Sequence, residues 1–265
     1  MKKNSEPVKN FVKIIKRLRK ECPWDRQQTH KSLRHSLIEE TYEVIEAIDQ
    51  NDTDELKKEL GDLLLHIVLH AVMAEEEKSF TLEDVIDSIS EKMVRRHPHV
   101  FGTTVVKNSH EVKRNWERIK MSEGRNSIID GVPKKMPALL RALRIQEKAS
   151  KVGFDWKKKR NVWKKVDEEI KELRVAEQSN NHARIEEEYG DLLFSLVNYS
   201  RFIGVNPEFA LKGSIDKFIR RFYHIEKELQ RRGKHIGEVS LKEMDEIWDA
   251  EKKSTAKEKN RKSKL

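Results

Sequence analysis

Residues 37–64 read LIEETYEVIEAIDQNDTDELKKELGDLL, and residues 166–193 read VDEEIKELRVAEQSNNHARIEEEYGDLL. Both stretches contain E-E-x-x-E followed, 19 positions after its second glutamate, by E-x-G-D-L-L. One such motif can recur by chance between two charged helices, but both motifs at an unchanged spacing indicate an internal duplication. The fold should therefore be built from two copies of one module.

The repeat extends beyond these acidic motifs. Three further pairs of matching segments keep the same order in both halves: a Trp/Asp pair at 24–25 and 155–156, K-x-x-R-R at 92–96 and 217–221, and W-x-x-x-K at 116–120 and 248–252. Chance similarity does not keep four matches in one order, so the duplication extends through most of the chain.

The apolar residues of each copy recur at helical spacing. In the first copy Leu37, Val44 and Ile48 fall on one helix face, and a similar stripe follows the short polar turn at 50–53. Each module should contain two long antiparallel helices, a third around 82–96 or 207–230, and a shorter one ending near the tryptophan. Because no segment alternates as a strand does, and Gly (10) and Pro (6) are few, we expect an all-α fold of two tandem bundle-like modules.

The domain organisation follows from these patterns. Two glycines and two prolines lie between 122 and 137, as is typical of a linker. We expect an N-terminal module over 1–121, a linker over 122–137, a C-terminal module over 138–250 and a basic tail over 251–265.

The net charge of +9 is concentrated at the two ends of the chain. Residues 1–20 carry +7 and residues 251–265 carry +5, which leaves −3 for the body between them. We therefore do not expect nucleic acid as a partner. Cys22 is the single cysteine, and no apolar run is long enough for a membrane span or a secretory signal. A cytoplasmic protein without a membrane partner is expected.

The acidic motifs predict a divalent-metal site. Acids at i and i+3 share a helix face, and antiparallel pairing of the two helices would bring four carboxylates together beside the apolar stripe. The negative charges of these carboxylates repel one another unless a cation lies between them. Oxygen ligands without His or Cys favour Mg²⁺ or Mn²⁺ over Zn²⁺. An isolated acidic pair is commonly a solvated face, but this whole arrangement recurs. The first-half ligands would be Glu40, Glu43, Glu59 and Asp62.

The remaining motifs suit a nucleotide polyphosphate. Mg²⁺ held by carboxylates usually completes its shell with substrate phosphates, K-x-x-R-R supplies positive charge for them, and a final-helix Trp can stack on a base. Alternatively, the Lys and Arg residues of the basic motif could be surface charges, and the Trp could be an anchor in the core. P-loop and Rossmann glycine motifs are absent. The His66/His70 pair has no copy in the second half, and Pro98 separates His97 from His99, so these histidines are expected to be structural.

The motifs CPWD (22–25), RRHPHVF (95–101) and VGFDW (152–156), with the paired acidic motifs, resemble the MazG family. Its members are tandem-domain nucleoside triphosphate pyrophosphohydrolases of the all-α NTP pyrophosphatase superfamily. The resemblance covers residues 8–252 and implies Mg²⁺-dependent hydrolysis of NTPs and dNTPs to monophosphates and pyrophosphate. It also implies broad base tolerance and a homodimer.

The resemblance further implies roles for individual residues, with the second module as the main catalytic one. Its metal ligands would be Glu169, Glu172, Glu188 and Asp191. Its nucleotide contacts would be Lys165, Glu168, Arg184, Ile185, Glu186, Glu187, Lys217, Arg220, Arg221 and Trp248, and its catalytic residues Glu168, Glu169, Glu172, Lys217 and Arg221. Lys92, Arg96 and Trp116 would match in the first half.

Two other functions compete with this hypothesis. One is a narrower hydrolase of the same superfamily, dUTPase-like or phosphoribosyl-ATP pyrophosphatase-like, against which the duplication and the RRHPHVF segment argue. The other is a helical regulatory module that binds nucleotides without turnover, against which the complete set of acids argues.

Overall fold

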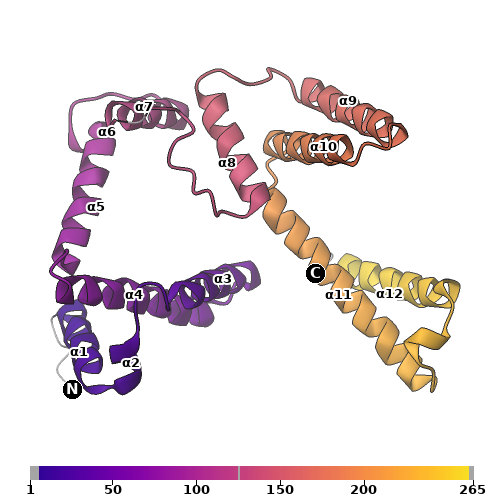
Figure 1. The fold of residues 1–265 in the computed structure, drawn as a ribbon, viewed down its shortest axis with the longest axis horizontal. Helices are drawn as coiled ribbons and strands as arrows, with labels where there is room; N and C mark the ends of the chain where they lie inside the picture. Colours follow the sequence, from indigo (N-terminus) through magenta and orange to yellow (C-terminus); the bar gives the residue numbers. More distant parts are fainter. Residues whose placement is uncertain (1–5, 125, 263–265) are drawn as a thin grey trace. The chain divides into compact units, whose positions relative to one another are not determined.

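The computed structural model describes residues 6–124 and 126–262, and Figure 1 shows a chain of helices over this part. The predicted all-α fold is confirmed, because the described residues contain helices and turns but no strand. Contacts divide the chain into two compact units, Met1–Val112 and Lys113–Leu265. No helix of the described part has the length and apolarity that crossing a bilayer requires.

The first unit is organised around one long helix pair. Its helices are α1 (Pro7–Glu21), α2 (Pro23–Gln27), α3 (Arg34–Gln50), α4 (Thr53–Glu76), α5 (Leu82–Arg96) and α6 (Pro98–Phe101). The pair α3–α4 turns at Asn51, whose φ of 55° is left-handed, and Asp52 then caps α4 by accepting from the amides of Asp54 and Glu55. The predicted polar turn is confirmed.

The core of the first unit lies under the C-terminal half of α4. Val68, Leu69 and Val72 pack there against Ile15 of α1 and against Leu33. Arg19 of α1 fastens this arrangement, since its guanidinium pairs with Glu76 at 2.6 Å and donates to the backbone carbonyls of α2 and its C-cap. Burial of this apolar cluster therefore holds α4 in place, which in turn positions the acidic N-terminal half of that helix.

The second unit repeats the long pair. It comprises most of α7 (Ser109–Ser122), then α8 (Ala138–Lys151), α9 (Lys159–Gln178), α10 (His182–Phe202), α11 (Pro207–Arg231), the 3₁₀ turn η1 (Ile236–Glu238) and α12 (Leu241–Lys262). The α9–α10 pair turns at Asn180, with φ 50°, and Asn181 caps α10. α8 packs on α10, while α11 pairs with α12 through Ile225, Leu229 and Ile247.

The predicted boundaries fall within this architecture as follows. The described residues between 123 and 137, which are 123–124 and 126–137, connect α7 to α8 without a helix, although the division between the units comes earlier, after Val112. α7 contributes to the second unit because Glu117 pairs with Lys151 of α8. Of the predicted basic tail, residues 251–262 continue α12, and residues 263–265 lie outside the described residues, as do residues 1–5 of the basic N-terminal segment.

The buried carboxylate of Glu117 gives the second unit a pH-dependent contact. Burial alone would raise its pKa, but hydrogen bonds from the ammonium groups of Lys151 (2.8 Å) and Lys120 (2.9 Å) outweigh burial and lower the pKa to about 2. The folded pKa thus lies below the ordinary value of 4.5, so this contribution to stability is present above pH 4.5 and is lost as the pH falls toward 2.

We expect Glu117→Gln to lower the free energy of unfolding by about 1–3 kcal/mol at neutral pH, the cost of breaking a largely buried charged hydrogen bond. Urea unfolding at neutral pH and at about pH 3 measures this difference between wild type and variant. The difference should shrink at the lower pH, because the Glu117 carboxylate of the unfolded chain, with its ordinary pKa of 4.5, then binds a proton and the unfolded state gains stability relative to the folded one. An unchanged difference at both pH values would contradict this explanation.

Candidate metal and nucleotide site

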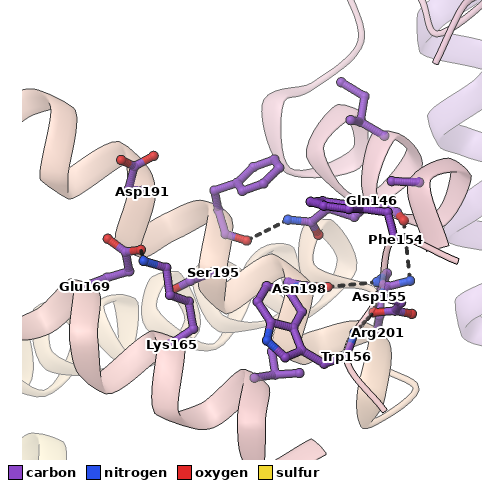
Figure 2. Close-up of a pocket in the computed structure, with 14 residues that line it drawn as sticks. Gln146, Phe154, Asp155, Trp156, Lys165, Glu169, Asp191, Ser195, Asn198 and Arg201 are labelled. Atoms are coloured by element: carbon purple, nitrogen blue, oxygen red, sulfur yellow. Dashed lines mark hydrogen bonds and ion pairs between the residues drawn. The ribbon is translucent and has the colours of Figure 1, made fainter. Parts of the chain in front are cut away.

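The helix pair of the second unit brings three carboxylates together. Glu169 and Glu172 lie one turn apart on α9, and Glu188 faces them from α10, with one oxygen of each within 4.8 Å of the others. Asp191, one turn beyond Glu188, stands outside this close group but lines the same cavity as Glu169. Figure 2 shows Asp191 and Glu169 on neighbouring helices beside that cavity. The arrangement offers hard oxygen donors only, as Mg²⁺ and Mn²⁺ prefer.

The helix pair of the first unit repeats the group. Glu40 and Glu43 of α3 meet Glu59 of α4, again with one oxygen of each within 4.8 Å of the others. Asp62 again stays outside the close group, but its charge contributes to raising the pKa of Glu40. Three of the four predicted ligands thus converge in each half, and the fourth lies one helical turn away.

The two groups differ in their counter-charge. In the second unit the ammonium of Lys165 pairs with Glu169 and Glu168, both at 2.7 Å, and these hydrogen bonds raise the pKa of Lys165. Ser36 occupies the matching position of the repeat, and within the described residues no cation pairs with Glu40, Glu43 or Glu59. This difference is visible in the aligned repeats, but the convergence of Lys165 on Glu169 appears only in the structure.

In the first group the pKa of Glu59 is raised. Burial is the largest cause, followed by the hydrogen bond with Glu55 and the charge of Glu43, and together they raise the pKa of Glu59 to about 7. In the second unit, burial and the charge of Glu169 raise the pKa of Glu172. Both groups therefore favour a cation that would relieve their repulsion.

We expect divalent-metal binding by the first unit to weaken as the pH falls through 7. Below that pH Glu59 holds a proton that the ion must displace, so binding releases protons. Mn²⁺ calorimetry on full-length Glu172→Gln, in which the second group is weakened, measures this at about pH 6 and about pH 8 in buffers of different ionisation enthalpy. Equal affinities without proton release would contradict the prediction.

The basic motif of the second half lies on a different helix from its carboxylates. Lys217 and Arg220 are exposed on α11, and the guanidinium of Arg221 lies 5.2 Å from the centre of the Trp248 ring. α11 packs with α12 and α8, whereas α9 pairs with α10. The Arg184–Glu187 stretch forms the first turns of α10, and Arg184 lies 3.9 Å from Glu188. These residues do not line the cavity beside Glu169.

The first-half counterparts are divided between the units. Lys92 and Arg96 lie on α5 in the first unit, but Trp116 lies on the part of α7 that belongs to the second unit. There Lys120 lies over the ring of Trp116, 5.9 Å from its centre. The structure therefore does not gather the whole predicted first-half set in one unit.

The histidines make local contacts. Nδ1 of His70 lies 2.7 Å from Nδ1 of His30, their rings stack, and the ring of His66 also stacks with that of His70. Burial is the main reason that the pKa values of His66 and His70 are lowered. Nδ1 of His97 lies 2.6 Å from the carbonyl of Met93 at the end of α5. Sequence reasoning did not foresee the part taken by His30.

A cavity of about 410 Å³ opens beside the second carboxylate group (Figure 2). α8, α9, α10 and the loop before α9 form its walls. Sequence reasoning missed most of the polar and aromatic side chains that line this cavity. Phe154, Asp155 and Trp156 belong to the quoted motif VGFDW, but Gln146, Asn198 and Arg201 belong to no motif identified from the sequence.

Comparison of the sequence with known proteins identifies relatives of this chain. A family model described as the MazG nucleotide pyrophosphohydrolase domain matches residues 28–101 and 158–226. A Thermotoga maritima protein named nucleoside triphosphate pyrophosphohydrolase/pyrophosphatase MazG is 46% identical over 95% of this chain and 98% of its own length. The Escherichia coli K12 nucleoside triphosphate pyrophosphohydrolase is 42% identical over 93% of this chain and 97% of its own. The uncharacterized Bacillus subtilis protein YabN is 48% identical over 92% of this chain, which covers 51% of it.

Proposed function

Because this chain belongs to the MazG nucleotide pyrophosphohydrolase family, we propose that it is a Mg²⁺-dependent enzyme converting NTPs and dNTPs to monophosphates and pyrophosphate, with broad base tolerance. The nucleoside triphosphate pyrophosphohydrolase activity is that of relatives that this chain matches over nearly their full length. The observation that carries the proposal is the converging carboxylate group of α9 and α10, which borders a cavity of nucleoside size.

The carboxylate oxygens suit the proposed ion. Glu169, Glu172 and Glu188, with Asp191, would hold it, and the same donors recur in Glu40, Glu43, Glu59 and Asp62. A bound Mg²⁺ supplies positive charge for phosphate oxygens and lowers the pKa of water. Mn²⁺ offers the same oxygen preference. The raised pKa of Glu172 supports this proposal, since a cation would relieve the repulsion that contributes to raising it.

Different residues of the chain would have different roles in the hydrolysis. Water attacks the α-phosphorus in line, the bond to the bridging oxygen breaks, and pyrophosphate leaves. Glu168, one residue before Glu169, would orient the water and accept its proton. Lys217, Arg220 and Arg221 would neutralise the charge developing on the leaving pyrophosphate. Lys165, Arg184, Ile185, Glu186, Glu187 and Trp248 complete the proposed nucleotide contacts.

We place the main catalytic centre in the second module, on the family resemblance. The pairing of Lys165 with Glu168 and Glu169 supports this assignment, because within the described residues no ammonium or guanidinium forms a direct ion pair with the matching carboxylates of the first module. The domain division at 1–121, 122–137, 138–250 and 251–265 stays part of the proposal.

A homodimer is the proposed assembly. Large apolar side chains lie about half exposed on α10 and α11, including Leu193, Leu196, Ile215 and Phe218. Large exposed apolar side chains that lie together mark an interaction surface, and a second copy would cover these. Covering these side chains with a second copy would also combine the helices of both copies into a larger bundle.

Pyrophosphate release from the full-length protein tests the function. Inorganic pyrophosphatase converts the product to phosphate, and a panel of four NTPs and four dNTPs is assayed with Mg²⁺ and with EDTA. We expect Mg²⁺-dependent release from all of them. Turnover of one base alone would favour the narrower dUTPase-like hydrolase. Nucleotide binding without turnover would favour the non-catalytic regulatory module.

A further inference from the structure

The ammonium of Lys165 is shared between two acidic side chains of its own helix. Its Nζ lies 2.7 Å from Oε1 of Glu168 and 2.7 Å from Oε1 of Glu169, and Figure 2 shows the second of these contacts. Ion pairs along an exposed helix face contribute little to stability. Glu169, however, is only 5% exposed, so its carboxylate depends on the ammonium for compensating charge.

This contact competes with the proposed binding of a divalent ion. Glu169 is a proposed metal ligand, and a cation that binds its carboxylate is repelled by an ammonium 2.7 Å from the same group. Lys165 also lines the cavity that Glu169 and Asp191 border, where it is a proposed nucleotide contact. An ammonium held by two carboxylates has one hydrogen left to donate, so full contact with a phosphate requires that it leave them.

The duplication shows that the acidic group does not need this lysine in order to form. Glu40, Glu43 and Glu59 of the first module converge as closely as their counterparts do. At the repeat spacing that matches Glu169 to Glu40, the place of Lys165 is taken by Ser36. The lysine is therefore an addition to the second group rather than a condition for its assembly.

A second cation lies near the carboxylates of the second module. Nε of Arg184 is 3.9 Å from Oε1 of Glu188 on α10. The matching residue of the first module is Glu55, whose side chain forms a hydrogen bond with Glu59. Two groups built from the same acids thus differ in the charges beside them, which indicates that they bind cations differently.

We propose that Lys165 occupies the place of the divalent ion in the second module until the phosphates of the nucleotide draw it away, so that this module binds ion and nucleotide together. The first module, with Ser36 in the matching place, binds the ion alone. This inference rests on the proposed function. Phosphate oxygens accept the hydrogen bonds of Lys165, which releases Glu169 for the ion, and each ligand then strengthens the binding of the other.

Calorimetry with Mn²⁺ alone tests the competition in the full-length chain. Glu43→Gln weakens the first group, so that the second can be followed in that background at about pH 8, where protons compete little. Lys165→Met keeps the apolar stem of the side chain and removes its charge. We expect the Kd for Mn²⁺ at the second group to fall about tenfold, within the usual range of coupling between two sites.

Two further variants separate this effect from net charge and from folding. Lys164 is the exposed neighbour of Lys165 on α9, and Lys164→Met makes the same change in charge but should leave the Kd unaltered. Ser36→Lys, made in the Glu172→Gln background, places the lysine in the first module and should raise the Kd of its group about tenfold. Equal tightening in Lys164→Met and Lys165→Met would overturn the proposal.

The nucleotide enters in a second titration. α,β-Methylene dATP, in which a methylene group replaces the oxygen between the α- and β-phosphorus atoms, is added before Mn²⁺. The factor by which it strengthens Mn²⁺ binding should be about tenfold smaller in Lys165→Met than in the protein that keeps the lysine. Direct binding of Mn²⁺ by the phosphates contributes to both and cancels in this ratio. An unchanged factor would contradict the exchange of Lys165.

Failure of the proposed function would look different. A wild type that released pyrophosphate from no nucleotide would reject the function, whereas the Mn²⁺ titrations need no turnover. Unchanged Mn²⁺ affinities in both Lys165→Met and Ser36→Lys would reject the inference, even for an active enzyme.

Discussion

Replacing Glu172 by glutamine should lower kcat for pyrophosphate release by about 10²- to 10³-fold, the range for losing one preorganised electrostatic group at a reacting centre. Glutamine keeps the shape of the side chain but removes the charge from the close group that Glu172 forms with Glu169 and Glu188. The residual activity should need more Mg²⁺ for half-saturation, because one ligand is weakened. Steady-state kinetics across a Mg²⁺ titration measure both quantities, and Asp191→Asn should act in the same direction.

The duplication provides a matched control for that experiment. Glu43 holds the same place in the first group, so Glu43→Gln makes the same chemical change in the other module. Placing the main centre in the second module predicts that Glu43→Gln has a much smaller effect than Glu172→Gln. Wild-type turnover in Glu172→Gln would contradict the assignment of the main catalytic centre to the second module. A large loss of turnover in Glu43→Gln alone would instead indicate that the first module holds the main catalytic centre.

Removing the ammonium of Lys217 should lower kcat about 10²-fold, because its charge is proposed to stabilise the leaving pyrophosphate. Lys217 is exposed on α11 and has no ion-pair partner within the described residues, so Lys217→Ala should leave thermal unfolding almost unchanged. A fall in kcat without a fall in stability separates this chemical role from a structural one.

The control for Lys217 lies on the same helix. Lys227 is also exposed on α11, beyond the proposed basic motif, and Lys227→Ala changes the net charge by the same amount. We expect normal kinetics from it. Equal losses in both variants would point to general electrostatic attraction of the nucleotide rather than to a position beside the leaving group, and added salt would then abolish the difference from wild type.

The close carboxylate groups were largely predictable because each depends on short-range geometry. Helical periodicity places Glu169 and Glu172 on one face, and a short turn with Asn181 as cap makes the next helix antiparallel. Those two facts suffice to bring Glu188 opposite. The duplication strengthened the prediction, since one acidic motif alone is ambiguous whereas two at equal spacing are not.

The helical repeat, the acidic group on each helix pair and, through the resemblance, the family could all be inferred from the amino-acid sequence. The surroundings of the second group became visible only in the folded chain: Lys165 pairs with Glu169, Gln146 donates to a backbone carbonyl, and Asn198 accepts from Arg201. This division arises because periodicity fixes neighbours along one helix or across a short turn. The meeting of α8 with α10, by contrast, depends on how apolar faces from distant parts of the chain pack together.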